Sequence, residues 1–304
     1  MNDSPAGRST SPLVLSYKGL SPDDELLGWL SDGAVGGIVL FRDNCTDEIA
    51  LRDSIAAMRN ASTHPLYTMI DEEGGRVRRL PDAPSSMKDL RNSEQRSPAE
   101  IGVAYEVVAQ RLKSLGIDTL LAPVVDIGND GAEWLNSRTI SHDNARVAEM
   151  ARAVIPAIQS VGVHACVKHF PGTGRVTLDP HHGPVTCTIN AGEWEAHERL
   201  PFDAAIASAV YMVLVGHQVM EGFGETLPSC LTPAIPKFLL RRHLGYQGLI
   251  LTDDLSMGAV ATMFPIEESV DLALEAGCDL VLVCNDRDAQ KRAVAHWMKR
   301  AVPS

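Results

Sequence analysis

The segment from Lys168 to Gly183 concentrates residue types that bind polar ligands and move protons. It carries three of the chain's ten histidines, a lysine and an aspartate, and glycines and prolines interrupt it. Glycine and proline favour loops over the interiors of helices and strands. An imidazole titrates near neutral pH, so it can both give and take a proton. The sequence therefore predicts a loop that holds a polar substrate and transfers a proton.

The spacing of Asp179 and His181 fits a proton-transferring pair. A carboxylate two residues from an imidazole can hydrogen-bond the ring, orient it and raise its pKa. A turn stabilised by the same contact is the purely structural alternative. The histidines do not favour a metal, because His181 and His182 are adjacent and adjacent side chains rarely face one ion. We expect neither a metal nor another cofactor.

The glycines at positions 172 and 174 form a Gly-x-Gly pair. The pair lacks the remaining residues of a phosphate-binding loop, so phosphate binding is not indicated. We interpret the two glycines as flexibility that lets the loop swing over the site.

A second candidate is the carboxylate pair Asp253-Asp254, which follows the apolar run 249–251. An aspartate after a strand is usually a turn or helix-cap residue, but here the apolar run would deliver Asp253 to a site. Asp254 is better placed to cap the next helix or support its neighbour. Ionisable residues follow other apolar runs in the same way, and they are Asp71 to Arg79, Asp126, Arg138, Lys168, His169 and His217.

Short apolar runs alternate along the chain with longer helical patterns, and this alternation predicts the fold. Several runs are apolar on both faces, as parallel strands buried on both sides require. The predicted strands are Leu13–Tyr17, Val35–Phe41, Leu66–Ile70, Thr119–Val125, His164–Lys168, Val210–Gly216, Gly248–Thr252 and Asp279–Val283. Eight strands alternating with helices favour an α/β fold, a single-domain (β/α)8 TIM-type barrel, over an open doubly wound sheet. Active sites of such barrels lie at the carboxyl ends of the strands, where the candidate residues fall.

Helix boundary signals support the same architecture. Ser97 to Glu100 reads as a capping box with Pro98 at the first helical position, and Gly116 should end that helix. Asp143 should begin a helix, and another should run from Thr232 to Gly245. We expect residues 1–12 to form a flexible tail and residues 13–304 to form the catalytic barrel.

Composition restricts the possible partners. The chain has 304 residues, of which 45% are hydrophobic, and its formal net charge is −12. This charge argues against nucleic acid and anionic membranes as partners. No apolar run approaches the ~20 residues of a membrane span, so we expect a cytoplasmic protein. The six scattered cysteines should be reduced and mostly buried.

Taken together, four motifs resemble glycoside hydrolase family 3, and within it the single-domain β-N-acetylglucosaminidases of bacterial cell-wall recycling. The motifs are Asp71 to Arg79, Lys168 to Gly174, Asp179-x-His181 and Thr252 to Met257. The resemblance covers nearly the whole chain, and it implies a monomer. It implies a retaining exo-acting hydrolase that removes terminal N-acetylglucosamine from peptidoglycan fragments, such as a muropeptide or disaccharide, through a covalent glycosyl-aspartate intermediate.

The resemblance also implies roles for individual residues. Asp253 matches the nucleophile, and His181 assisted by Asp179 matches an acid/base pair on a mobile loop. The positions that match ligands of the sugar hydroxyls are Asp71, Arg79, Arg138, Lys168 and His169. His217 should line the same pocket, whereas Arg76 should be structural.

Three residues depart from the family pattern. The family usually has His or Leu where Thr173 stands, and Ser or Thr where Pro180 stands. Proline fixes φ and removes a backbone donor, so the loop is expected to be stiffer or to close differently. Glu72 replaces a common Gln and is expected to add negative charge near the pocket.

Other functions remain open from the sequence. A β-glucosidase or a glycoside phosphorylase of the same family is the nearest alternative. A catalytically silent sugar-binding protein would lack a catalytic residue, whereas Asp253, Asp179 and His181 are all present. A metal-dependent barrel hydrolase is the third class.

Overall fold

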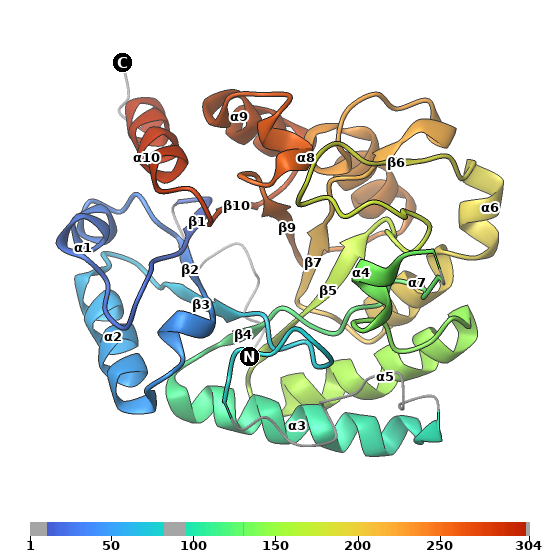
Figure 1. Cartoon of the computed structure of the whole chain (residues 1–304), viewed down its shortest axis with the longest axis horizontal. Coiled ribbons are helices and arrows are strands. Elements are labelled where there is room, and N and C mark those ends of the chain that lie inside the picture. The colour runs from blue at the N-terminus through green and yellow to red at the C-terminus, as the bar shows by residue number, and fades with distance from the viewer. Residues whose placement is uncertain (1–10, 82–94, 130, 302–304) are drawn as a thin grey trace.

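Parallel strands form a closed barrel at the centre of the molecule (Figure 1). The computed structural model describes residues 11–81, 95–129 and 131–301. The barrel strands are β1 (Leu13–Leu15), β2 (Gly37–Leu40), β3 (Tyr67–Ile70), β4 (Thr119–Leu120), β5 (His164–Phe170), β7 (Met212–Val215), β9 (Leu249–Asp254) and β10 (Leu280–Val283). Each pairs in parallel with its neighbours, and β1 closes the barrel against β10. The predicted eight-stranded barrel is confirmed, and the open-sheet alternative is wrong.

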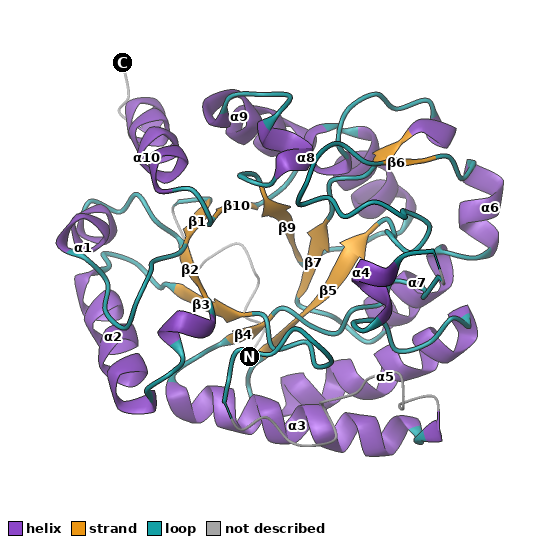
Figure 2. Cartoon of the chain, in the orientation of Figure 1, coloured by secondary structure: helices purple, strands orange, loops and turns teal. Residues whose placement is uncertain are grey.

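Helices surround the barrel, as the secondary-structure colouring shows (Figure 2). The α-helices are α1 (Asp24–Ser31), α2 (Glu48–Ala61), α3 (Pro98–Leu115), α4 (Glu133–Asn136), α5 (Asn144–Ser160), α6 (Ala191–Ala196), α7 (Arg199–Ala207), α8 (Gly258–Ala261), α9 (Ile266–Ala276) and α10 (Arg287–Ala301). The short 3₁₀ helices are η2 (Arg42–Asn44), η5 (Glu221–Phe223) and η6 (Ser229–Leu231), and η7 (Ala234–His243) is a π-helix.

Helix ends follow the local signals in the sequence. Ser97 caps α3 in a capping box with Glu100, and Gly116 ends the helix at a φ of 87°. A left-handed residue at this position satisfies terminal carbonyl groups, and glycine adopts it without a Cβ penalty. Asp143 accepts a hydrogen bond from Arg146 N at the start of α5. All three predicted boundaries are confirmed.

The barrel wall separates two apolar layers, as a doubly buried parallel sheet requires. In β2, Val39 packs inside the barrel, while Ile38 and Leu40 pack outward against the helices. All six cysteines are free and buried, which confirms the prediction for them.

The expected tail and a small extra sheet differ from the prediction. Residues 1–10 of the tail lie outside the described residues, but Ser11 and Pro12 are buried, and Pro12 O accepts a hydrogen bond from Val281 N. The folded part therefore includes two residues that we assigned to the tail. The strands β6 (Thr186–Cys187) and β8 (Val219–Met220) pair with each other beside the barrel, and the sequence did not predict them. Within the described part, no helix is long and apolar enough to cross a membrane.

Candidate active site

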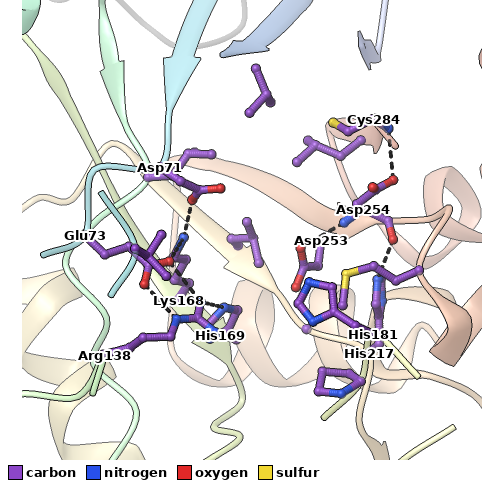
Figure 3. Close-up of a pocket in the computed structure, with 18 of the residues that line it drawn as sticks. Asp71, Glu73, Arg138, Lys168, His169, His181, His217, Asp253, Asp254 and Cys284 are labelled. Carbon is purple, nitrogen blue, oxygen red and sulfur yellow. Dashed lines mark hydrogen bonds and ion pairs between the residues drawn. The ribbon is translucent and has the colours of Figure 1, made fainter. Parts of the chain in front are cut away.

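A pocket of about 200 Å³ opens at the carboxyl ends of the barrel strands. Its labelled side chains form two walls (Figure 3). One wall carries Asp71, Glu73, Arg138, Lys168 and His169, and the other carries His181, His217, Asp253 and Asp254. Of the nine predicted site residues, eight line this pocket. The ninth, Asp179, contacts His181.

Lys168 is held between two carboxylates on the first wall. Its Nζ lies 2.5 Å from Asp71 Oδ1 and 2.5 Å from Glu73 Oε1, and its side chain is buried. Burial lowers the pKa of Lys168, but the charges of Asp71 and Glu73 outweigh it and raise that pKa above its ordinary value. Lys168 is therefore a fixed cation at the end of β5.

Glu73 also binds Arg138, and neither carboxylate oxygen of Glu73 faces the pocket without a partner. Arg138 Nε and Nη2 donate to Glu73 at 2.7 and 2.8 Å, a bidentate and buried ion pair. Burial raises the pKa of Glu73, but Arg138 and Lys168 more than reverse this and hold it well below its ordinary range. Sequence reasoning missed Glu73, although it stands two residues after Asp71 in the predicted motif. Arg138 was predicted to bind a sugar hydroxyl, and two of its nitrogens are instead committed to Glu73.

Contacts with Arg138 and Asp126 determine the tautomer of His169. Arg138 Nη2 lies 3.2 Å from His169 Nε2, and an arginine nitrogen can only donate. Nε2 is therefore the acceptor, and Nδ1 carries the proton that His169 donates to Asp126 Oδ2 at 2.6 Å. Burial raises the pKa of Asp126, but the contacts with His169 and with the Thr173 amide outweigh it, so that pKa is lowered. Asp126, noted at a strand end but not assigned to the site, orients a predicted ligand.

The first part of the loop after β5 is anchored rather than flexible. Thr173 N donates to Asp126 Oδ1 at 2.6 Å, and Trp194 Nε1 donates to Pro171 O at 2.7 Å. A Cβ atom on Gly174 would lie 1.9 Å from the carbonyl oxygen of Ile127. Glycine is needed at position 174 for this close approach of two backbones, which corrects our interpretation of it as a source of flexibility.

Asp253 lies at the end of β9 and is partly exposed to the pocket. Its Oδ1 accepts the N–H of Asp254 at 2.9 Å. Burial raises the pKa of Asp253, but the His217 and His169 rings, the Asp254 amide and Lys168 outweigh it and lower that pKa. Asp253 is thus an ionised carboxylate facing the cavity.

Asp254 points its oxygens away from the cavity into a hydrogen-bond network. Oδ1 accepts from Ser256 N at 3.0 Å, Ser256 Oγ at 2.7 Å and Cys284 N at 2.9 Å, and Oδ2 accepts from Asn285 Nδ2 at 2.7 Å. Asp254 therefore ties the turn after β9 to the end of β10. This agrees with the predicted supporting role.

His217 lines the pocket, but both of its ring nitrogens are engaged. Nε2 lies 2.9 Å from Asp254 O, and a carbonyl oxygen only accepts, so Nε2 carries a proton. Nδ1 lies 3.3 Å from Cys230 Sγ. Burial holds the pKa of Cys230 well above its ordinary value, so the thiol keeps its proton and can donate it to Nδ1. His217 was predicted to bind substrate, and its contacts instead make it a support for the backbone beside Asp253.

Asp179 and His181 form the predicted hydrogen-bonded pair. His181 Nδ1 lies 2.6 Å from Asp179 Oδ1, which also accepts the His181 amide at 3.0 Å. Burial raises the pKa of Asp179, but the amide and the ring of His181 outweigh it, so that pKa is lowered. Asp179 is a carboxylate acceptor that occupies Nδ1 and leaves Nε2 to exchange a proton. The His181 ring is 55% exposed, so it remains open to a ligand.

The Asp71–Arg79 motif splits into pocket and support residues. Arg79 Nη2 lies 3.7 Å from Asp71 Oδ2, and both side chains line the cavity. Arg76, expected to be structural, is exposed and also lines the cavity. Glu72 is buried outside the cavity lining and accepts hydrogen bonds from Arg79 N at 2.5 Å and Leu80 N at 2.9 Å. Glu72 thus folds this loop, instead of adding charge to the pocket as we expected.

No group of three or more His, Cys, Asp or Glu side chains within the described residues is arranged to hold a metal ion.

Comparison with known families completes this picture. The model of the glycosyl hydrolase family 3 N-terminal domain matches residues 13–301. The chain belongs to glycoside hydrolase family 3. A β-hexosaminidase of Xylella fastidiosa is 31% identical over 280 residues, which cover 90% of this chain and 83% of that protein. A β-hexosaminidase of Stenotrophomonas maltophilia is 32% identical over the same coverage.

Solved structures agree with this family. NagZ from Neisseria gonorrhoeae, solved with N-trifluoroacetyl-D-glucosamine, has a TM-score of 0.86 at 27% identity, covering 96% of this chain and 90% of NagZ. A family 3 β-N-acetylglucosaminidase from Paenibacillus has a TM-score of 0.91 at 29% identity. The matched region covers 95% of this chain and 56% of that larger protein. The activity that follows is glycoside hydrolysis of the β-N-acetylhexosaminidase type, on a carbohydrate substrate.

Proposed function

We propose that the protein is a retaining exo-β-N-acetylglucosaminidase that acts on peptidoglycan fragments through a covalent intermediate on Asp253. The observation that carries the proposal is the position of Asp253 opposite Lys168, on the same wall as His181 (Figure 3). An ionised carboxylate facing a polar cavity can attack an anomeric carbon. The imidazole next to it can serve the departing and incoming oxygens in turn.

The first chemical step forms a bond between an Asp253 oxygen and the anomeric carbon as the glycosidic bond breaks. His181 gives its Nε2 proton to the leaving oxygen, and Asp179 stabilises the positive charge that His181 carries beforehand. In the second step, the neutral His181 takes a proton from water, and the hydroxyl displaces Asp253 from the sugar. Two displacements at one carbon retain the β configuration.

The opposite wall suits the hydroxyl groups of one sugar. Lys168 and Arg79 supply donors, and Asp71 supplies an acceptor, at the mouth of β3 and β5. We assign Arg138 and His169 to the same wall, where Arg138 offers its remaining nitrogen and His169, whose ring nitrogens contact Arg138 and Asp126, positions Arg138. The cavity of about 200 Å³ is smaller than the roughly 300–1,000 Å³ typical of drug-sized ligand sites. That size favours one terminal residue and therefore exo action.

The amino-sugar preference is supported by the relatives. They are β-hexosaminidases, and one solved relative was crystallised with an N-acylated glucosamine derivative. We propose a muropeptide or disaccharide with a terminal N-acetylglucosamine as the substrate, and a monomeric enzyme in the cytoplasm.

A panel of aryl glycosides tests the proposal. The enzyme should hydrolyse an aryl N-acetyl-β-glucosaminide faster than the matching β-glucoside, without phosphate, and proton NMR should show β-N-acetylglucosamine as the first product. A fluorinated, slowly turning-over substrate should add one glycosyl mass to the peptide that contains Asp253. Phosphate-dependent turnover would indicate a phosphorylase, and an α-anomer as first product would rule out the covalent intermediate.

A further inference from the structure

The loop that carries the Asp179–His181 pair rests on the first residues of α8. We propose that Gly258 is a positioning residue, which forms a backbone notch that sets where the acid/base pair lies relative to Asp253. This inference rests on the proposed roles of His181 and Asp253. It adds a residue to which the family comparison and the sequence motifs gave no role.

The first observation is the absence of room for a side chain at position 258. A Cβ atom on Gly258 would lie 2.8 Å from His181 O, 3.0 Å from Gly183 N and 3.0 Å from His182 C. All three neighbours are backbone atoms of the loop, so no side-chain rotation can relieve the contact. Atoms of real side chains do not approach backbone this closely, so the loop fits only because residue 258 is glycine.

The second observation is a hydrogen bond across the same contact. Ala259 N donates to Pro180 O at 3.1 Å. The amides at the start of a helix lack partners within the helix, so a loop carbonyl that accepts from one of them is fixed in place. Pro180 is buried and lines the catalytic pocket, while Leu178 beside the pair is 67% exposed. The loop therefore presents its inner face to α8 and its outer face to solvent.

The notch belongs to the same turn as the proposed nucleophile. Met257 N donates to Asp254 O at 3.0 Å, and Leu255 N donates to Leu282 O at 2.9 Å. The first bond closes the turn between Asp253 and Gly258, and the second holds that turn against β10. Docking on Gly258 therefore fixes the position of the loop relative to Asp253, although the two parts of the site are distant in the sequence. The departure at Pro180 fits this arrangement, because its ring fills space against the pocket and its carbonyl makes the bond.

The consequence of filling the notch can be estimated from these distances. An alanine at position 258 would bring its methyl to 2.8 Å from a loop oxygen that needs roughly 3.4 Å, so the loop must retreat by several tenths of an ångström. A misplacement of about 1 Å costs about 10²-fold in rate. We expect a roughly 10- to 100-fold loss in steps that need the proton of His181.

The test uses Gly258→Ala, with Gly183→Ala as the matched control on the same loop. A Cβ on Gly183 meets nothing within 4 Å, so this control adds the same methyl without a clash. Each variant is assayed for kcat/KM on phenyl and 2,4-dinitrophenyl N-acetyl-β-glucosaminides, with thermal unfolding as a check of the fold. The phenyl leaving group needs the acid, whereas dinitrophenolate leaves without it.

We expect Gly258→Ala to lose about 10- to 100-fold on the phenyl substrate and less than about threefold on the dinitrophenyl substrate. Gly183→Ala should stay within about threefold of wild type on both. Pro180→Gly provides a second variant, which removes the buried ring that packs against the pocket and places no atom in the notch, and it should show the same selective loss.

Two outcomes would overturn the inference. One is wild-type activity of Gly258→Ala on both substrates. The other is an equal loss on both, which would mean damage to the Asp253 turn rather than displacement of the acid. His181→Ala separates this from the proposed function. If His181→Ala shows no dependence on the leaving group, the acid assignment fails. If the loss in His181→Ala depends on the leaving group and the loss in Gly258→Ala does not, only the proposed role of Gly258 fails.

Discussion

Replacing Glu73 with glutamine should destabilise the protein strongly, although the two side chains have nearly the same shape. Glu73 is 1% exposed and neutralises two buried cations, Lys168 at 2.5 Å and Arg138 through a bidentate contact. Without the charge of Glu73, Arg138 loses its ionic partner and Lys168 keeps only Asp71. Removing one partner of a buried ion pair costs about 3–5 kcal/mol, because an uncompensated charge remains in the interior.

An exposed pair provides the matched control. Arg292 binds Glu267 with the same bidentate geometry, at 2.9 and 2.6 Å, but its side chain is 54% exposed and that of Glu267 is 34% exposed. Water and salt screen such a pair, so Glu267→Gln should leave the free energy of unfolding nearly unchanged. The same substitution, at pairs of the same geometry, should therefore have different effects through burial alone.

Urea unfolding at neutral pH measures the difference. With a dependence of about 3 kcal/mol per molar urea, Glu73→Gln should lower the midpoint by roughly 1 M or more. The double variant Glu73→Gln/Arg138→Met should lose less than the sum of the single losses, because it leaves no unpaired arginine. Equal midpoints for Glu73→Gln and Glu267→Gln would refute the argument from burial.

The pH dependence of this difference follows from the sign of the shift. The folded pKa of Glu73 lies below its unfolded value of about 4.3, so the folded state holds fewer protons on this group. Its stabilising contribution is fully present above that unfolded pKa and is lost as the pH falls toward the folded pKa. The stability gap between wild type and Glu73→Gln should therefore be constant from pH 8 to pH 6 and shrink below about pH 4.

Three further predictions concern the second wall of the pocket. Asp253→Ala should abolish turnover of aryl N-acetyl-β-glucosaminides while the unfolding midpoint stays near that of wild type, and wild-type activity would overturn the nucleophile assignment. His181→Ala should lower kcat/KM for poor leaving groups by about 10²–10⁴-fold, and azide should restore turnover of activated substrates as a glycosyl azide; Asp179→Asn should show a smaller loss of the same kind. Cys230→Ser keeps a donor for His217 Nδ1 and should retain activity. Cys230→Ala leaves that nitrogen unpaired and should lower kcat more than it raises KM. Equal activity of the two variants would show that the thiol contact does not position His217.

Local patterns in the sequence predicted the frame of the site. Strand ends could be placed because doubly apolar runs stop where polar residues begin, as at Asp71 and Asp253. The α3 boundaries at Ser97 and Gly116 are set by interactions within a few residues, and the structure confirms them. Once the runs close into a barrel, their carboxyl ends must converge, so residues far apart in the sequence could be assigned to one pocket.

Contacts between distant segments could not be predicted in the same way. Nothing near Glu73 in the sequence distinguishes it from Glu72, yet one lies in the pocket wall and the other folds a loop. The need for glycine at position 174 comes from the Ile127 carbonyl, on the segment that follows β4. The helix predicted from Thr232 to Gly245 exists, but Leu244 N donates to Leu239 O, five residues back, and no composition signal indicated a π-helix.

The charges of the two walls explain why an imidazole suits the proposed acid/base role here. The first wall pairs Asp71 and Glu73 with the cations Lys168 and Arg138, so its carboxylates already have partners. A carboxylic acid facing Asp253 would add a like charge whenever it deprotonated, and that charge would raise the pKa of the nucleophile. An imidazole is neutral after it gives up its proton, so it places no second negative charge beside Asp253 when that carboxylate is released from the intermediate. The negative charge that assists the imidazole is displaced onto Asp179, behind the ring and on the loop, where the Gly258 notch can set its distance from the nucleophile.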